Sequence, residues 1–169
     1  MRLLLLTLSF IFSLKNIYAQ SYNCARVGIG YQGLIIGELG YSHLVLHDKG
    51  VFGGSYCFHG SIEGNYKTNH ENIYGVKFGY ENCWAIFLFG GEAKFLSNFS
   101  KSAPMFLVKG GISFFGAASL TYGYNIKIPE SPFPGINNQL LLSVNLGRKL
   151  WKEQINPAKT NQSTQKASL

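Results

Sequence analysis

Hydrophobic and polar residues alternate along most of the chain between residues 24 and 148. In the segment 119–128, SLTYGYNIKI, the apolar side chains of Leu120, Tyr122 and Tyr124 fall at every second position and share one face. A period of two residues is that of a β-strand, whose successive side chains point to opposite faces. No segment between 24 and 148 has a clear helical period, so the pattern predicts an all-β protein.

The alternation divides into eight segments that are longer than most strands of globular proteins. The predicted strands are 24–31, 34–46, 51–64, 73–82, 84–96, 105–114, 117–128 and 138–147. Lengths of about 8–14 residues suit tilted strands that cross a bilayer. We therefore expect an eight-stranded, antiparallel, up-and-down transmembrane β-barrel with a polar, plugged interior.

The connections between these strands are expected to differ at the two ends of the barrel. Tight turns are predicted at 47–50, 82–83 and 115–116, and longer polar loops at 65–72, 97–104 and 129–137. The first connection, 32–33, is an exception, because it is short and lies on the long-loop rim. Short turns on one rim and long loops on the other are typical of bacterial outer-membrane barrels. An even number of strands then places both termini on the short-turn rim, in the periplasm.

All nine charged residues of the predicted strands fall on one face. We predict that this face lines the barrel and forms a polar network. The network is expected to comprise Arg26, Glu38, His59, Glu63, Lys77, Glu81, Glu92, Lys94, Lys109, Asn125 and Lys127. A buried charge must be paired, and Glu92 and Lys109 are the expected pair because they lie equally far from the loop at 97–104.

The opposite face has no Asp, Glu, Lys or Arg. Its predicted lipid-facing residues include Tyr31, Tyr41, Phe78, Phe87, Phe89, Tyr122, Tyr124 and Leu142. So many large side chains would overfill an eight-stranded barrel, whose interior only just accommodates its side chains. Aromatic residues also recur near the strand ends, as in the girdles of membrane barrels. We therefore expect the apolar face to point outward into lipid. The alternative is a soluble, secreted, lipocalin-like barrel with the apolar face inside, binding an apolar ligand.

The two chain ends differ from the region between them. Residues 1–19 combine Arg2, an apolar run over 3–14 and a small residue at Ala19, which predicts a secretory signal peptide. Residues 20–147 form the predicted barrel, and 148–169 are expected to be a flexible basic and polar tail. The net charge is +7, but residues 20–146 hold eight basic and seven acidic residues, so nucleic-acid binding is not expected.

Together, the signal peptide, the eight amphipathic strands and the alternating loop lengths resemble the small outer-membrane β-barrels of Gram-negative bacteria, of the OmpA transmembrane domain and OmpX type. The resemblance covers about residues 24–147 and is architectural rather than a motif match. It departs at the last strand, NQLLLSVNLG, which lacks the terminal aromatic residue of those barrels and is followed by a tail. The resemblance implies an outer-membrane location, with lipid and other surface or periplasmic proteins as partners, and no cofactor.

The expected function is a structural or surface-interaction role and not that of a large-solute porin, because eight strands leave little lumen. A less favoured alternative is a lipid A-modifying hydrolase, which would need a histidine, a serine and an acid side by side. Two groupings offer these residue types: His43 with Ser42 and Glu38, and His59 with Ser61 and Glu63. In the first, His43 and Ser42 point to opposite faces, and in the second the spacing is that of strand alternation. No catalytic, cofactor-binding or metal-binding residues are therefore predicted.

Overall fold

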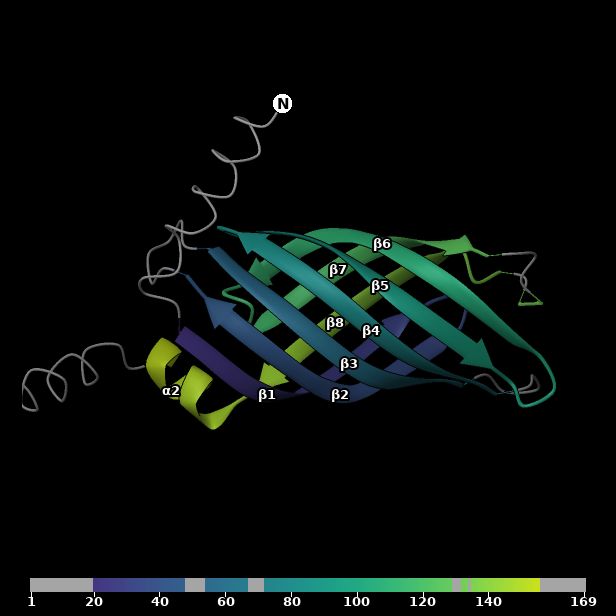
Figure 1. The fold of residues 1–169 in the computed structure, drawn as a ribbon, viewed down its shortest axis with the longest axis horizontal. Coiled ribbons are helices and arrows are strands. Elements are labelled where there is room, and N and C mark those ends of the chain that lie inside the picture. Colours follow the sequence, from purple (N-terminus) through teal and green to yellow (C-terminus); the bar gives the residue numbers. More distant parts are fainter. Residues whose placement is uncertain (1–19, 48–53, 67–71, 129–131, 134, 156–169) are drawn as a thin grey trace, which may run out of the picture.

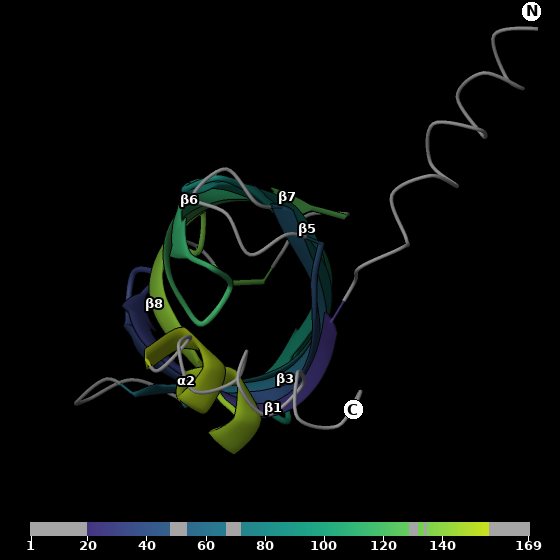
Figure 2. The same cartoon turned by 90° about the vertical axis from the view of Figure 1, so that its left-hand side faces the viewer.

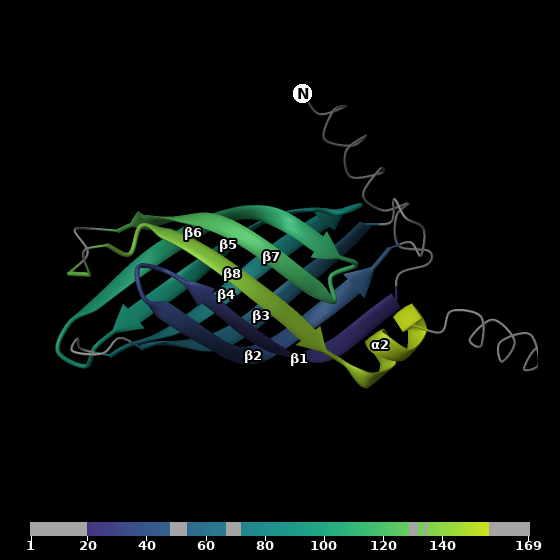
Figure 3. The ribbon, with the colours of Figure 1, turned by 180° about the vertical axis from the view of Figure 1, so that it is seen from behind.

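The chain forms a closed, antiparallel, up-and-down β-barrel of eight strands (Figure 1). The computed structural model describes residues 20–47, 54–66, 72–128, 132–133 and 135–155. Its strands are β1 (Gln20–Tyr31), β2 (Ile35–Leu46), β3 (Gly54–Tyr66), β4 (Ile73–Trp84), β5 (Phe87–Ser97), β6 (Ser102–Phe114), β7 (Ala118–Lys127) and β8 (Asn138–Leu146). Each strand pairs with the next, and β8 closes the barrel by pairing with β1 (Figure 3). The predicted all-β barrel of eight strands is confirmed.

The connections depart from the prediction between β5 and β6, where the connection spans only 98–101. The difference has a local cause: the Asn98 side-chain oxygen accepts hydrogen bonds from the backbone N–H groups of Ser100 and Lys101. Such an Asn-centred turn lets the β5–β6 ladder extend to the Ser97–Ser102 pair. The contrast between the two rims is therefore weaker than the sequence predicts. Most of the predicted tight turn at 47–50 lies outside the described residues.

Two rims bound the barrel. The first, named the α2 rim, carries the start of β1, the end of β8 and the helix α2 (Arg148–Ile155), which follows β8 (Figure 2). The other, named the far rim, carries the connections 32–34, 98–101 and 128–137. Residues 1–19 and 156–169, on which the signal peptide and most of the tail were predicted, lie outside the described residues.

The barrel interior contains an apolar cluster near each rim. At the α2 rim the cluster consists of Tyr22, Cys24, Leu44, Leu46, Cys57, Ala117 and Leu150. At the far rim it consists of Ile73, Leu96, Ala103, Met105, Phe133 and Ile136, with Leu34 packed against it. The parity of the sequence predicted a polar inner face along the whole length of the strands. The structure instead has apolar residues on the inner face near both rims.

The helix α2 replaces the first part of the flexible tail that we expected from residue 148. Leu150 is fully buried in the apolar cluster of the α2 rim, and the Trp151 indole N–H donates to the backbone oxygen of Asn145 at 2.9 Å. A side chain at Gly147 would place its Cβ 2.6 Å from the Cys24 Sγ, so any other residue would have to displace the Cys24 thiol at this turn. No helix among the described residues is both long enough and apolar enough to span a membrane.

Replacing Leu150 with alanine should detach α2 without opening the barrel. Removing a buried leucine costs about 2–5 kcal/mol, more than a helix of eight residues gains from its own backbone. We expect amide hydrogen exchange in residues 148–152 to become faster, while protection within β1–β8 is unchanged. Lys149→Ala, an exposed change in the same helix, is the control, and equal exchange in the two variants would contradict this account of α2.

Candidate functional site

Eight charged side chains are buried in the middle of the barrel, between the two apolar clusters. They are Arg26, Lys77, Lys94, Lys109, Glu38, Glu63, Glu81 and Glu92, each at most 5% exposed, and we call them the charge cluster. Four are basic and four are acidic, so the cluster is balanced. They come from strands β1 to β6, all of which point these residues inward.

The centre of the charge cluster is the contact of Lys109 with two carboxylates. The Lys109 ammonium contacts both Glu81 and Glu92, so the predicted ion pair between Glu92 and Lys109 forms. These two residues do not lie directly opposite each other, because Glu92 faces Leu107 and Lys109 faces Gly90. The pair is thus a diagonal one, which long side chains can still reach.

Arg26 and Lys77 extend the cluster on either side of Glu38. The Arg26 guanidinium donates to Glu81 Oε1 at 2.6 Å and to Glu38 Oε1 at 2.9 Å. The Lys77 ammonium lies 2.9 Å from Glu38 Oε2 and 3.5 Å from Glu92 Oε2. Arg26 and Lys77 each contact two carboxylates. The loss of either positive charge would therefore leave two buried carboxylates with less opposite charge beside them.

Lys94 connects the charge cluster to neutral amides toward the far rim. Its ammonium donates to Gln139 Oε1 at 2.6 Å, to Gln32 Oε1 at 3.1 Å and to Glu63 Oε2 at 3.4 Å. The Asn125 side chain also donates to Gln32 Oε1, at 3.1 Å. Sequence reasoning missed both glutamines, although Gln139 lies on the inward parity of β8. Gln32 lies in a turn, where parity gives no signal.

His59 lies beside the central carboxylates, with its Nε2 3.4 Å from Glu81 Oε1 and 3.5 Å from Glu92 Oε1. Gly79 faces His59 across the β3–β4 ladder, and a Cβ there would collide with the imidazole. His59, Glu81 and Glu92 place their ligand atoms within 4.8 Å of one another, a spacing that could hold a metal ion. The Lys109 ammonium, however, already supplies the positive charge to both carboxylates. The sequence did not indicate this grouping, which brings together three adjacent strands.

The two remaining residues of the predicted inner network, Asn125 and Lys127, differ in burial. Asn125 is buried, but Lys127, at the end of β7, is only partly buried and lies outside the charge cluster. Lys127 was predicted as an inner residue because it follows the parity of Asn125. At the rim, the same parity no longer encloses a side chain.

The outer wall of the barrel is apolar on every strand. The eight predicted lipid-facing residues are 48–68% exposed: Leu142, Phe87, Tyr41, Tyr124, Tyr31, Tyr122, Phe89 and Phe78. Within the described strands, every Asp, Glu, Lys and Arg side chain is buried except that of Lys127, which is partly buried. The charged face predicted from the sequence is thus the inner face of the barrel, and the face without charged residues is the outer face.

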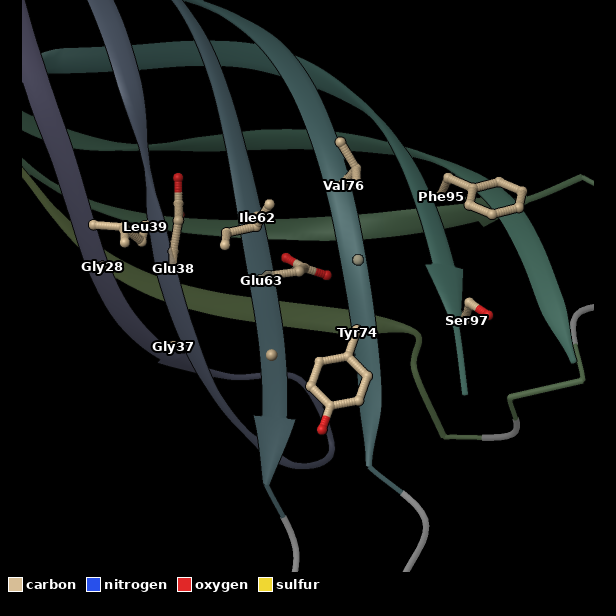
Figure 4. Close-up of a pocket in the computed structure, with 12 residues that line it drawn as sticks. Gly28, Gly37, Glu38, Leu39, Ile62, Glu63, Tyr74, Val76, Phe95 and Ser97 are labelled. Carbon is tan, nitrogen blue, oxygen red and sulfur yellow. The ribbon is translucent and has the colours of Figure 1, made fainter. Parts of the chain in front are cut away.

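A hollow of about 720 Å³ interrupts this wall near the far rim (Figure 4). Gly37 and Gly64 face each other across the β2–β3 ladder and leave two outward positions without side chains. Exposed apolar side chains surround them, among them Leu39, Ile62 and Phe95. The hollow is therefore continuous with the apolar wall.

The two candidate catalytic groupings are not assembled. His43 is hydrogen-bonded through Nδ1 to Asn23 Oδ1 at 2.8 Å, whereas the Ser42 hydroxyl donates inside the barrel to Asn145 Oδ1 at 2.8 Å. His59 is close to Glu81 and Glu92, while the Glu63 carboxylate is near Lys77 and Lys94. The three cysteines are free and buried.

Comparison of the chain with protein-family models, with curated proteins and with solved structures found no significant match.

Replacing Lys109 with methionine should strongly destabilise the barrel, because Glu81 and Glu92 would then remain buried with too little positive charge. The expected loss is about 3–5 kcal/mol of unfolding free energy, measured by urea titration of the chain folded in detergent micelles. The double variant Lys109→Met/Glu92→Gln restores the balance and should lose less than the single variant.

Lys101→Met is the matched control, since Lys101 is exposed in the connection between β5 and β6. Its effect should stay within about 0.5 kcal/mol. Equal unfolding free energies for Lys109→Met and Lys101→Met would show that the charge cluster does not hold the barrel together.

Proposed function

We propose that the chain is a small bacterial outer-membrane β-barrel that crosses the bilayer with its eight strands. One observation carries the proposal: large apolar side chains are exposed on all eight strands, whereas the charged residues of the described strands are buried, except for partly buried Lys127 at the end of β7. Water favours the opposite arrangement, and lipid favours this one.

The extent of the apolar wall argues against a soluble protein. Soluble monomers rarely expose a contiguous apolar patch of more than a few hundred Å². Here exposed residues such as Phe78, Phe89 and Tyr122 belong to a wall that continues around the barrel. A closed barrel also satisfies its backbone hydrogen bonds internally, which is what a spanning structure in lipid requires.

A soluble, lipocalin-like barrel would need an apolar interior for its ligand. In this chain the middle of the interior is filled by the charge cluster, with fully buried Arg26, Lys77 and Glu92. An apolar ligand there would strip these groups of their partners, at a cost of several kcal/mol for each ion. The membrane proposal has no such conflict.

The proposed role is structural or surface-interacting, with outer-membrane lipid and other surface or periplasmic proteins as partners. Support for a plugged interior comes from the two apolar clusters at either side of the charge cluster. A large hydrated solute would have to displace Leu150 at one rim and Phe133 at the other. In this proposal the α2 rim faces the periplasm, and the connections of the far rim face the cell exterior.

A pair of arginine substitutions on one strand tests the membrane proposal. Phe78 and Asn82 are both exposed, lie on the same face of β4 and are separated by one intervening outward position, Tyr80. Phe78→Arg places a charge in the middle of the wall, where it should cost about 2–4 kcal/mol, and Asn82→Arg places it near the α2 rim, where the cost falls to about 0–1 kcal/mol.

The measurement is the unfolding free energy of each variant in phospholipid vesicles, with Phe78→Ala as the control for loss of the aromatic ring. A wall in lipid is supported if Phe78→Arg lowers the unfolding free energy more than Asn82→Arg does and more than Phe78→Ala does. If both arginines are tolerated equally, as at any water-exposed position, the membrane proposal is wrong.

A further inference from the structure

Four basic side chains are exposed among the residues whose side chains the structure describes, and three of them gather at one place. They are Lys101 on the far rim and Arg148, Lys149 and Lys152 on α2. The sequence of α2, RKLWKEQI, holds these three basic residues and one acidic residue, Glu153. Among the described side chains, the exposed basic residues are therefore concentrated on the α2 rim.

The orientation of α2 is fixed by its apolar side. Leu150 is buried among Tyr22, Cys24 and Leu44, and the Trp151 indole is held by Asn145. With these two residues turned toward the barrel, Arg148, Lys149 and Lys152 are left on the exposed side. The basic surface, which we define as these three residues, is thus a consequence of how the helix docks.

The basic surface begins where the apolar wall ends. Leu146, the last residue of β8, is 50% exposed and belongs to the wall, and Arg148 follows only two residues later. If the wall lies in hydrocarbon, residues 148–152 lie at the level of the lipid headgroups. Lysine and arginine side chains there can keep their stems along apolar surface and their charges in the phosphate layer.

We propose that the basic surface of α2 binds the phosphate groups of anionic phospholipids in the leaflet at the α2 rim. The inference rests on the proposed membrane function and names the lipid class that this rim recognises. Arg148 can present paired N–H donors to a phosphate, and the two lysines add point charges. Each basic residue near an anionic surface contributes about 1 kcal/mol, or roughly a fivefold preference.

The test compares two lipids with the same acyl chains, phosphatidylglycerol and phosphatidylcholine, added in equal amounts to the full chain in detergent. Native mass spectrometry counts the bound molecules of each lipid. We expect the unaltered chain to retain phosphatidylglycerol at least about fivefold more often. The variant Arg148→Gln/Lys149→Gln/Lys152→Gln should bind the two lipids about equally.

Two single variants locate the effect. Lys149→Gln and Lys101→Gln each remove one exposed lysine, the first on α2 and the second on the far rim. Only Lys149→Gln should lower the preference for phosphatidylglycerol. Equal retention of both lipids by the unaltered chain, or an undiminished preference in the triple variant, would overturn the proposal.

Flotation of the chain with vesicles of pure phosphatidylcholine separates this inference from the proposed function. Insertion into neutral vesicles depends on the apolar wall and not on α2. A chain that floats with these vesicles but shows no lipid preference refutes the basic surface alone. A chain that does not float refutes both.

Discussion

The structure depends on the pairing of eight charged side chains inside a narrow barrel. The interior of an eight-stranded barrel is only just wide enough for its side chains, and each of these eight charges lies within 4 Å of an opposite charge. The closed order of the strands makes this possible, because it brings Arg26 of β1 to Glu81 of β4 at 2.6 Å. Glycine at position 79 leaves the space that His59 needs beside Glu92. Within the closed barrel, the loss of one of these charges would leave its partners buried and uncompensated, which is one of the most destabilising arrangements in a protein.

The same pairing sets the character of the outer surface. Because successive side chains of a strand point to opposite faces, a strand that places Lys77 and Glu81 inside must place Phe78 and Tyr80 outside. The apolar wall follows from this alternation on every strand, and lipid is the solvent in which such a wall is stable. The apolar clusters near the two rims complete the arrangement, since they separate the charge cluster from solvent at both ends. The proposed structural or surface-interaction role agrees with this arrangement.

Much of the fold could be predicted from the sequence because one period runs through all eight strands. The outward positions of Tyr122 and Tyr124 and the ion pair between Glu92 and Lys109 follow from that period and from the positions of the loops. The features that were missed depend on contacts between distant parts of the chain. Phe133 lies in a connection without periodicity yet is buried inside the barrel. The short helix α2 is held by buried Leu150 and by the hydrogen bond from the Trp151 indole to Asn145. The grouping of His59, Glu81 and Glu92 likewise arises only when three strands pair in their actual register.

We propose that this barrel folds with its apolar wall in lipid. The most direct measurement is refolding of the purified chain from urea by dilution, either into aqueous buffer or into vesicles of phosphatidylcholine. Folding is followed by the change in gel migration between unheated and heated samples and by β-sheet circular dichroism. The account predicts a folded, heat-modifiable species only with vesicles, and aggregation in buffer alone. A soluble, folded monomer in buffer without lipid or detergent would contradict it.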